Sequence, residues 1–107
     1  MIILWKFDEL SPGMGFPSIM DALEKEPYQA KEAVLEYLRN GNVYLVTASR
    51  FEDIFTKENT KHELFCMTDG KYSWSSAIPY YVEHYHLRLP KDFEDHVLSN
   101  SQAAFNT

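Results

Sequence analysis

The sequence predicts a single α+β domain over residues 1–107, with helices on either side of a small antiparallel sheet. Apolar residues recur at helical spacing in the first third of the chain and again in the last third. Between them, residues 43–48 (VYLVTA) are rich in β-branched and aromatic side chains, which are typical of a strand. The pair Asp69-Gly70, flanked by two strand-like runs, predicts a β-hairpin.

Two helices are expected in the N-terminal part of the chain. Residues 2–7 are compatible with a short strand or a helical turn, and the Pro- and Gly-containing residues 11–15 end that segment. The first helix is expected to begin near Pro17, and three apolar residues follow it at helical spacing. These are Ile19, Met20 and Leu23.

The second predicted helix begins at Pro27, because a proline costs least in the first turn of a helix. Its inward face would be formed by Ala30, Val34, Tyr37 and Leu38. The opposite side, which includes Lys31, would face water. The helix would end at Asn40-Gly41, where a glycine readily takes the left-handed conformation.

The middle of the chain is predicted to be β-structure. Residues 43–48 are apolar at both alternating sets of positions, which predicts an inner strand covered on both faces. Residues 64–68 and 71–74 would form the hairpin. In a two-residue loop, Asp69 and Gly70 would both have positive φ.

The C-terminal third is predicted to return to helix. Ser75 or Ser76 would cap the first backbone amides, and Pro79 would lie in the first turn. Four apolar residues follow at helical spacing, namely Ile78, Tyr81, Val82 and Tyr85. Leu89-Pro90 would end this helix and begin another, and residues 99–107 are expected to form a frayed tail. In the last helix, Phe93 and Val97 would point inward.

The chain is acidic, with 16 Asp and Glu against 10 Lys and Arg and a net charge of −6. This balance argues against direct binding of nucleic acid, which depends on clustered basic residues, and favours a basic protein partner. Apolar runs are too short for a membrane span of about 20 residues. A single cysteine, Cys66, cannot form an internal disulfide, so a cytoplasmic protein is expected.

The titratable residues do not form a recognisable catalytic or metal-binding pattern. His84 and His86 are two residues apart on a predicted helix, so they would point away from each other. His62-Glu63 lacks a second histidine at the spacing of zinc proteases, and Cys66 lies in an apolar strand where a thiol is usually inert. No catalytic residue, metal site or cofactor is therefore predicted, and a small enzyme is the minor alternative.

A partner-binding surface is the expected role of the acidic residues. Glu83, Asp92, Glu94 and Asp95 form a dense acidic set near the C-terminal helices. Tyr80 and Trp74 are expected to remain partly exposed beside them. Exposed Tyr and Trp next to charged residues are typical of a protein-binding hot spot.

Residues 67–93 carry a family resemblance. The features are the Asp69-Gly70 turn, a strand ending in Trp74, a helix with Tyr80-Tyr81, and the Leu89-Pro90 pair. In these features the segment resembles small acidic immunity proteins of bacterial polymorphic-toxin and contact-dependent inhibition systems. The resemblance implies a protein that occludes the active site of a basic toxin domain, often a nuclease, without catalysis.

Other acidic interaction modules remain open at this point. A phage or mobile-element adaptor, or a protein that mimics nucleic acid, would present the same kind of surface to a host enzyme. In either case an acidic surface steers a basic partner and favours the correct complex.

Overall fold

The computed structural model describes residues 2–4, 6–10 and 12–105, with side chains described up to residue 100. It confirms the α+β class and contains a four-stranded sheet. In chain order the elements are β1 (Ile2–Ile3), the 3₁₀ helix η1 (Ile19–Ala22), α1 (Lys31–Arg39), β2 (Asn42–Glu52), β3 (Asn59–Thr68), β4 (Tyr72–Ser75), α2 (Ala77–Tyr85) and α3 (Lys91–Phe105).

The sheet has the strand order β1-β4-β3-β2. β2, β3 and β4 are antiparallel neighbours, but β1 runs parallel to β4, so the sheet is mixed and not purely antiparallel. The prediction that residues 43–48 form an inner strand is wrong, because β2 is the last strand of the sheet. Apolar residues on both faces usually indicate burial, yet here they lie on an edge strand.

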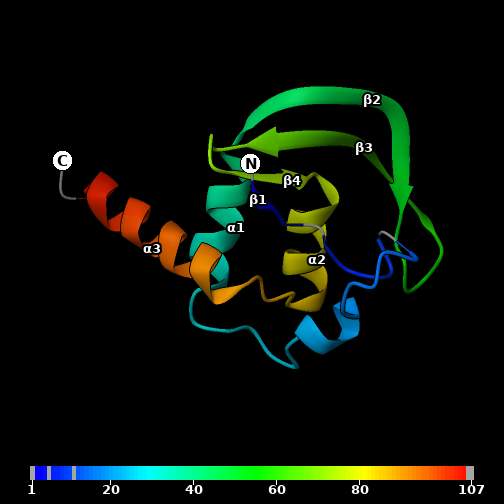
Figure 1. Cartoon of the computed structure of the whole chain (residues 1–107), viewed down its shortest axis with the longest axis horizontal. Helices are drawn as coiled ribbons and strands as arrows, with labels where there is room; N and C mark the ends of the chain where they lie inside the picture. Colours follow the sequence, from blue (N-terminus) through cyan, green and yellow to red (C-terminus); the bar gives the residue numbers. More distant parts are fainter. Residues whose placement is uncertain (1, 5, 11, 106–107) are drawn as a thin grey trace.

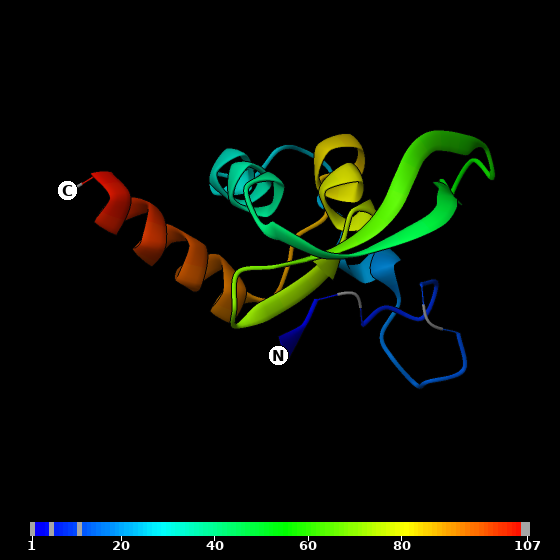
Figure 2. The ribbon, with the colours of Figure 1, turned by 90° about the horizontal axis from the view of Figure 1, so that it is seen from above.

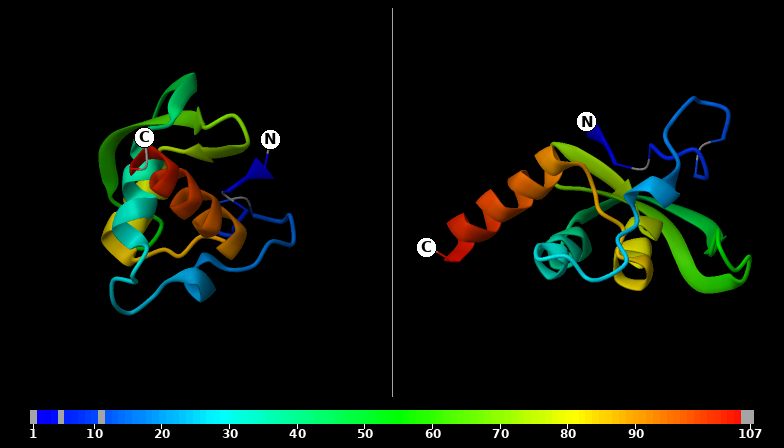
Figure 3. Two further views of the ribbon diagram at one scale, coloured as in Figure 1. Left: turned by 90° about the vertical axis from the view of Figure 1, so that its left-hand side faces the viewer. Right: turned by 90° about the horizontal axis from the view of Figure 1, so that it is seen from below.

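Helices α1 and α2 cover one face of the sheet, and the N-terminal segment with η1 runs along the other side (Figures 1 and 2). β2 and β3 form a long, bent ribbon that extends beyond the two helices (Figure 1). Helix α3 packs against α1 near its start and then projects away from the rest of the molecule (Figure 3). Residues 99–105 of the expected tail belong to α3, and residues 106–107 lie outside the described part of the chain.

The core confirms the inward faces predicted for the helices. The fully or almost fully buried residues include Val34, Leu38, Ile78, Tyr81, Val82, Phe93 and Val97. Helical spacing places these side chains on the faces that meet between α1, α2, α3 and the sheet. Leu87, in the segment after α2, is also buried in the core, and it forms an isolated β-bridge with Leu23.

The first predicted helix is reduced to the single turn η1. Ser18 caps this turn by accepting a hydrogen bond from the amide of Met20, while its hydroxyl donates to the carboxylate of Glu9. Glu9 also accepts from the amide of Ile19 at 2.8 Å. The chain then becomes extended at Leu23, because that residue pairs with a distant segment instead of continuing the helix.

The connection between β3 and β4 includes Asp69 and Gly70, as predicted, but its geometry differs. Only Gly70 has positive φ, at +100°. The Asp69 carboxylate accepts hydrogen bonds from the amides of Lys71 and Tyr72. The aspartate therefore shapes the loop with its side chain and keeps its own backbone in an ordinary conformation.

Two further helix predictions are corrected by long-range hydrogen bonds. Lys31 is buried and not water-facing, since its ammonium donates to the carbonyl of Glu83 and contacts His86 Nδ1 at 2.9 Å. Ser76 begins α2 but does not cap it with its side chain. Its hydroxyl donates instead to the carbonyl of Glu63, which fastens the start of α2 to β3.

Gly41 is needed for space and not for a left-handed backbone. Its φ is not positive, and a Cβ added there would lie 2.5 Å from Cζ2 of Trp74. Replacing Gly41 by alanine is expected to lower the free energy of unfolding by about 1–2 kcal/mol through overpacking. Chemical denaturation measures this loss, and Asn42→Ala at the exposed next position serves as the control. An equal effect of the two variants would contradict the proposed clash.

Candidate functional site

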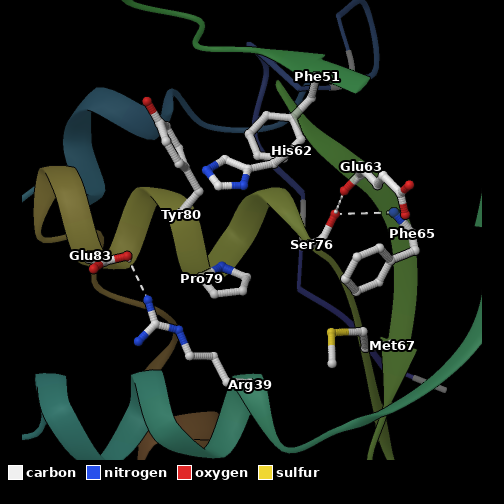
Figure 4. A pocket seen from close by; sticks show the side chains of 10 residues that line it. All are labelled: Arg39, Phe51, His62, Glu63, Phe65, Met67, Ser76, Pro79, Tyr80 and Glu83. Atoms are coloured by element: carbon white, nitrogen blue, oxygen red, sulfur yellow. Dashed lines mark hydrogen bonds and ion pairs between the residues drawn. The ribbon is translucent and has the colours of Figure 1, made fainter. Parts of the chain in front are cut away.

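A hollow of about 270 Å³ lies between the β2–β3 ribbon and the exposed side of α2 (Figure 4). It is partly open to solvent, and its lining combines apolar and charged side chains. The lining residues are Arg39, Phe51, His62, Glu63, Phe65, Met67, Ser76, Pro79, Tyr80 and Glu83.

Three aromatic rings form one end of the hollow. Phe51 stacks on His62 with 6.1 Å between ring centroids, and Tyr80 meets Phe51 edge-on at 5.4 Å. These side chains come from β2, β3 and α2, respectively. Such ring contacts hold the end of the ribbon against the helix.

Tyr80 is oriented by a buried carboxylate. Asp53 accepts hydrogen bonds from the hydroxyls of Tyr80, at 2.7 Å, and Tyr85, at 2.5 Å, and from the amides of Phe55 and Thr56. Burial opposes ionisation of Asp53, but these hydrogen bonds outweigh it and lower the pKa of its carboxyl group. The hydrogen bond to Asp53 also raises the pKa of Tyr80 to about 12. Tyr80 is therefore neutral and is held in one orientation by Asp53.

An ion pair lies at the opposite rim. The Nη2 atom of Arg39 is 2.6 Å from Oε2 of Glu83, and both side chains are about half exposed. Because the carbonyl of Glu83 also accepts from buried Lys31, the backbone below this pair is held in place. Glu83 is consequently neutralised by a cation of the same chain.

The structure separates the predicted partner-binding residues into two groups. Tyr80 and Glu83 line the hollow together, whereas Asp92, Glu94 and Asp95 lie on α3 and do not line it. Glu94 is half-buried and receives two 3.3 Å hydrogen bonds from the guanidinium of Arg88.

Asp92 and Asp95 differ from the other acidic residues of the predicted set. Both side chains are exposed, and neither forms an ion pair with any residue that the structure describes. Only these two carboxylates of the set thus keep their full charge available to an outside partner.

Trp74 is not part of an exposed surface, contrary to the prediction. It is 0% exposed, and its indole N–H donates to the carbonyl of Leu38 at 3.1 Å. The ring packs between α1 and α3 against Tyr37 and Phe93. A strand position that faces helices accounts for this burial, since the alternation along β4 turns Trp74 to the covered face.

Cys66 and His62 do not line a common hollow. Cys66 lies beside Leu64 and Tyr81 in a different hollow from the one that His62 lines. Within residues whose side chains are described, no group of three His, Cys, Asp or Glu could hold a metal ion. The helices of the described chain are also too short or too polar to cross a bilayer.

Sequence reasoning missed the exposed apolar part of β2. Val43, Tyr44, Leu45 and Val46 are each about half exposed or more. Four consecutive apolar residues carry the signal, but such a run is typical of a buried strand as well as of an exposed edge. Comparison with family models, curated proteins and solved structures finds no match to this chain.

Proposed function

We propose that this chain is a non-catalytic inhibitor of the immunity-protein type, which binds a basic toxin domain in the cytoplasm and covers its active site. The observation that carries the proposal is the pair of exposed, unpaired carboxylates of Asp92 and Asp95 on a chain of net charge −6. Their counterparts Glu83 and Glu94 are already paired with arginines. Free carboxylates are the groups that would meet Lys and Arg of the partner.

Electrostatics gives this surface its expected role. An acidic surface attracts a basic partner over several ångströms and raises the association rate. This attraction weakens as salt screens the charges. If the toxin domain is a nuclease, the two carboxylates would take the places of substrate phosphates. Carboxylate–guanidinium pairs at the centre of such an interface would add specificity.

The class of function is tested by co-expression with the product of the gene immediately upstream. Rescue of growth from that protein's toxicity, together with a complex that weakens as salt rises, is the expected result. A toxic upstream product that is neither bound nor neutralised would contradict the proposal.

The surface is tested by reversing both free charges. The double variant Asp92→Lys and Asp95→Lys is expected to raise the dissociation constant of the toxin complex at least tenfold, or by about 1.4 kcal/mol. Isothermal titration calorimetry measures this change, and the thermal melting of the free variant checks its fold.

The matched control applies the same charge change elsewhere. Asp8 and Glu58 are also exposed acidic residues, so Asp8→Lys with Glu58→Lys alters net charge equally. It is expected to change affinity far less, because net charge alone acts mainly through screened, long-range attraction. Equal losses in both double variants would show that α3 is not the contact surface.

A further inference from the structure

Strand β2 exposes four consecutive large apolar residues at the edge of the sheet. Exposed fractions are 50% for Val43, 48% for Tyr44, 52% for Leu45 and 66% for Val46. Natural edge strands are usually shortened, charged or covered, since an open edge attracts other strands. The 11 residues of β2 have no charged side chain before Arg50.

The exposed residues lie on both faces of the sheet. Val46 is opposite Phe65, a residue that lines the hollow under α2. Leu45 is opposite Cys66, which lines the hollow on the other face. A register shift between Val43 and Leu45 interrupts the regular alternation. The hydroxyl of Tyr44 lies 2.6 Å from Ser73 Oγ, across β3.

We infer that β2 is the contact surface of a homodimer, in which the β2 strands of two copies pair antiparallel across a two-fold axis. A helix or a loop laid on the sheet would cover one face only. An added strand extends both faces at once, because its side chains alternate between them. It also supplies hydrogen-bond partners on the side of β2 that no other strand of the described chain pairs with.

The properties of the segment favour a second copy of this chain as the added strand. Residues 42–49 contain no charged side chain, so two copies can lie side by side without like charges facing each other. A basic partner strand would instead place ammonium or guanidinium groups against Leu45 and Val46. The acidic residues Asp92 and Asp95 lie on α3 and not on β2, so this contact leaves them free.

The area and the closure of the contact fit a dimer. The four side chains, which are 48–66% exposed, offer apolar area toward the ~800 Å² that each partner contributes to a standard interface. The neighbouring uncharged residues of β2 and the backbone edge add to this area. In the resulting sheet, the outermost strand at either end is β1, which is only two residues long. A strand this short offers little edge for further pairing, so growth stops at two copies.

The proposal is tested by sedimentation equilibrium of the wild type and Val46→Lys. We expect a dimer for the wild type, and for Val46→Lys a dissociation constant raised at least tenfold, about 1.4 kcal/mol. The control is Met20→Lys, because Met20 is 59% exposed on η1, away from β2. It should leave the dimer unchanged. Circular dichroism of both variants checks that they fold.

Hydrogen exchange of the wild type gives a second readout that needs no variant. Amides of residues 42–50 should become more protected as protein concentration rises. A wild type that stays monomeric at every concentration would overturn the dimer and leave the edge to a different protein. A dimer unaffected by Val46→Lys, or protection confined to residues outside β2, would overturn it equally. The toxin-binding proposal is judged separately, by growth rescue.

Discussion

Replacing Trp74 by alanine is expected to lower the free energy of unfolding by about 3–5 kcal/mol. The ring is wholly buried and contacts aromatic residues of α1 and α3, so its removal leaves a cavity between three elements. The loss is a large part of the 5–15 kcal/mol that stabilises a typical domain. Urea denaturation, followed by circular dichroism, measures the loss.

Two further variants separate the causes of this effect. Trp74→Phe keeps most of the ring but removes the N–H that donates to Leu38, so it should cost less than the alanine variant. Met20→Ala removes an apolar side chain of which 59% is exposed, and it should change stability by less than about 0.5 kcal/mol. A Trp74→Ala protein as stable as Met20→Ala would contradict the placement of Trp74 in the core.

Local periodicity was sufficient to predict the helices that pack with one face inward. Ile78 and Val82 on α2, and Phe93 and Val97 on α3, are buried as their spacing predicts. The reason is that a regular helix fixes the direction of each side chain from its position alone. Helical spacing did not predict the conformation of residues 17–26. A hydrogen bond to Glu9 and the β-bridge at Leu23, both made with residues outside the segment, determine that conformation.

The other wrong predictions concern residues whose surroundings are formed by segments far away in the sequence. Lys31 is buried because Glu83 and His86 provide acceptors more than 50 residues further on. Trp74 is buried because α1 and α3 cover its face of β4. The edge position of β2 depends on the pairing order of four strands, which composition does not encode.

The candidate site could be predicted only in part, because it also depends on contacts between residues far apart in the sequence. Acidic residues on one helix could be recognised together, but their pairing with Arg39 and Arg88 could not. Pairing distinguishes a carboxylate that supports the fold from one that is free to bind. Asp92 and Asp95 are proposed for the toxin contact because they are not paired with a cation of the chain. The uncharged strand β2 is proposed for the dimer contact because the strand order places it at the edge of the sheet.

The loop between β3 and β4 depends on one ionised carboxylate. The Asp69 Oδ2 atom accepts from the Tyr37 hydroxyl at 2.5 Å and lies 2.8 Å from His96 Nε2, while Oδ1 accepts the two loop amides. Burial opposes its ionisation, but these hydrogen bonds outweigh burial and lower the pKa of Asp69 to about 2. One side chain thereby ties the loop to α1 and α3.

Replacing Asp69 by asparagine is expected to lower the free energy of unfolding at neutral pH by on the order of 2 kcal/mol. Because the pKa of Asp69 is lowered by folding, its contribution is complete above about pH 5 and is lost as the pH falls toward 2. The wild type should therefore lose stability over this range more steeply than Asp69→Asn, and the two should converge in strong acid. Urea denaturation at a series of pH values measures both curves.

Asp92→Asn, at an exposed position on α3, is the control and should follow the wild type. Parallel curves for Asp69→Asn and the wild type would show that the ionised carboxylate does not stabilise the loop.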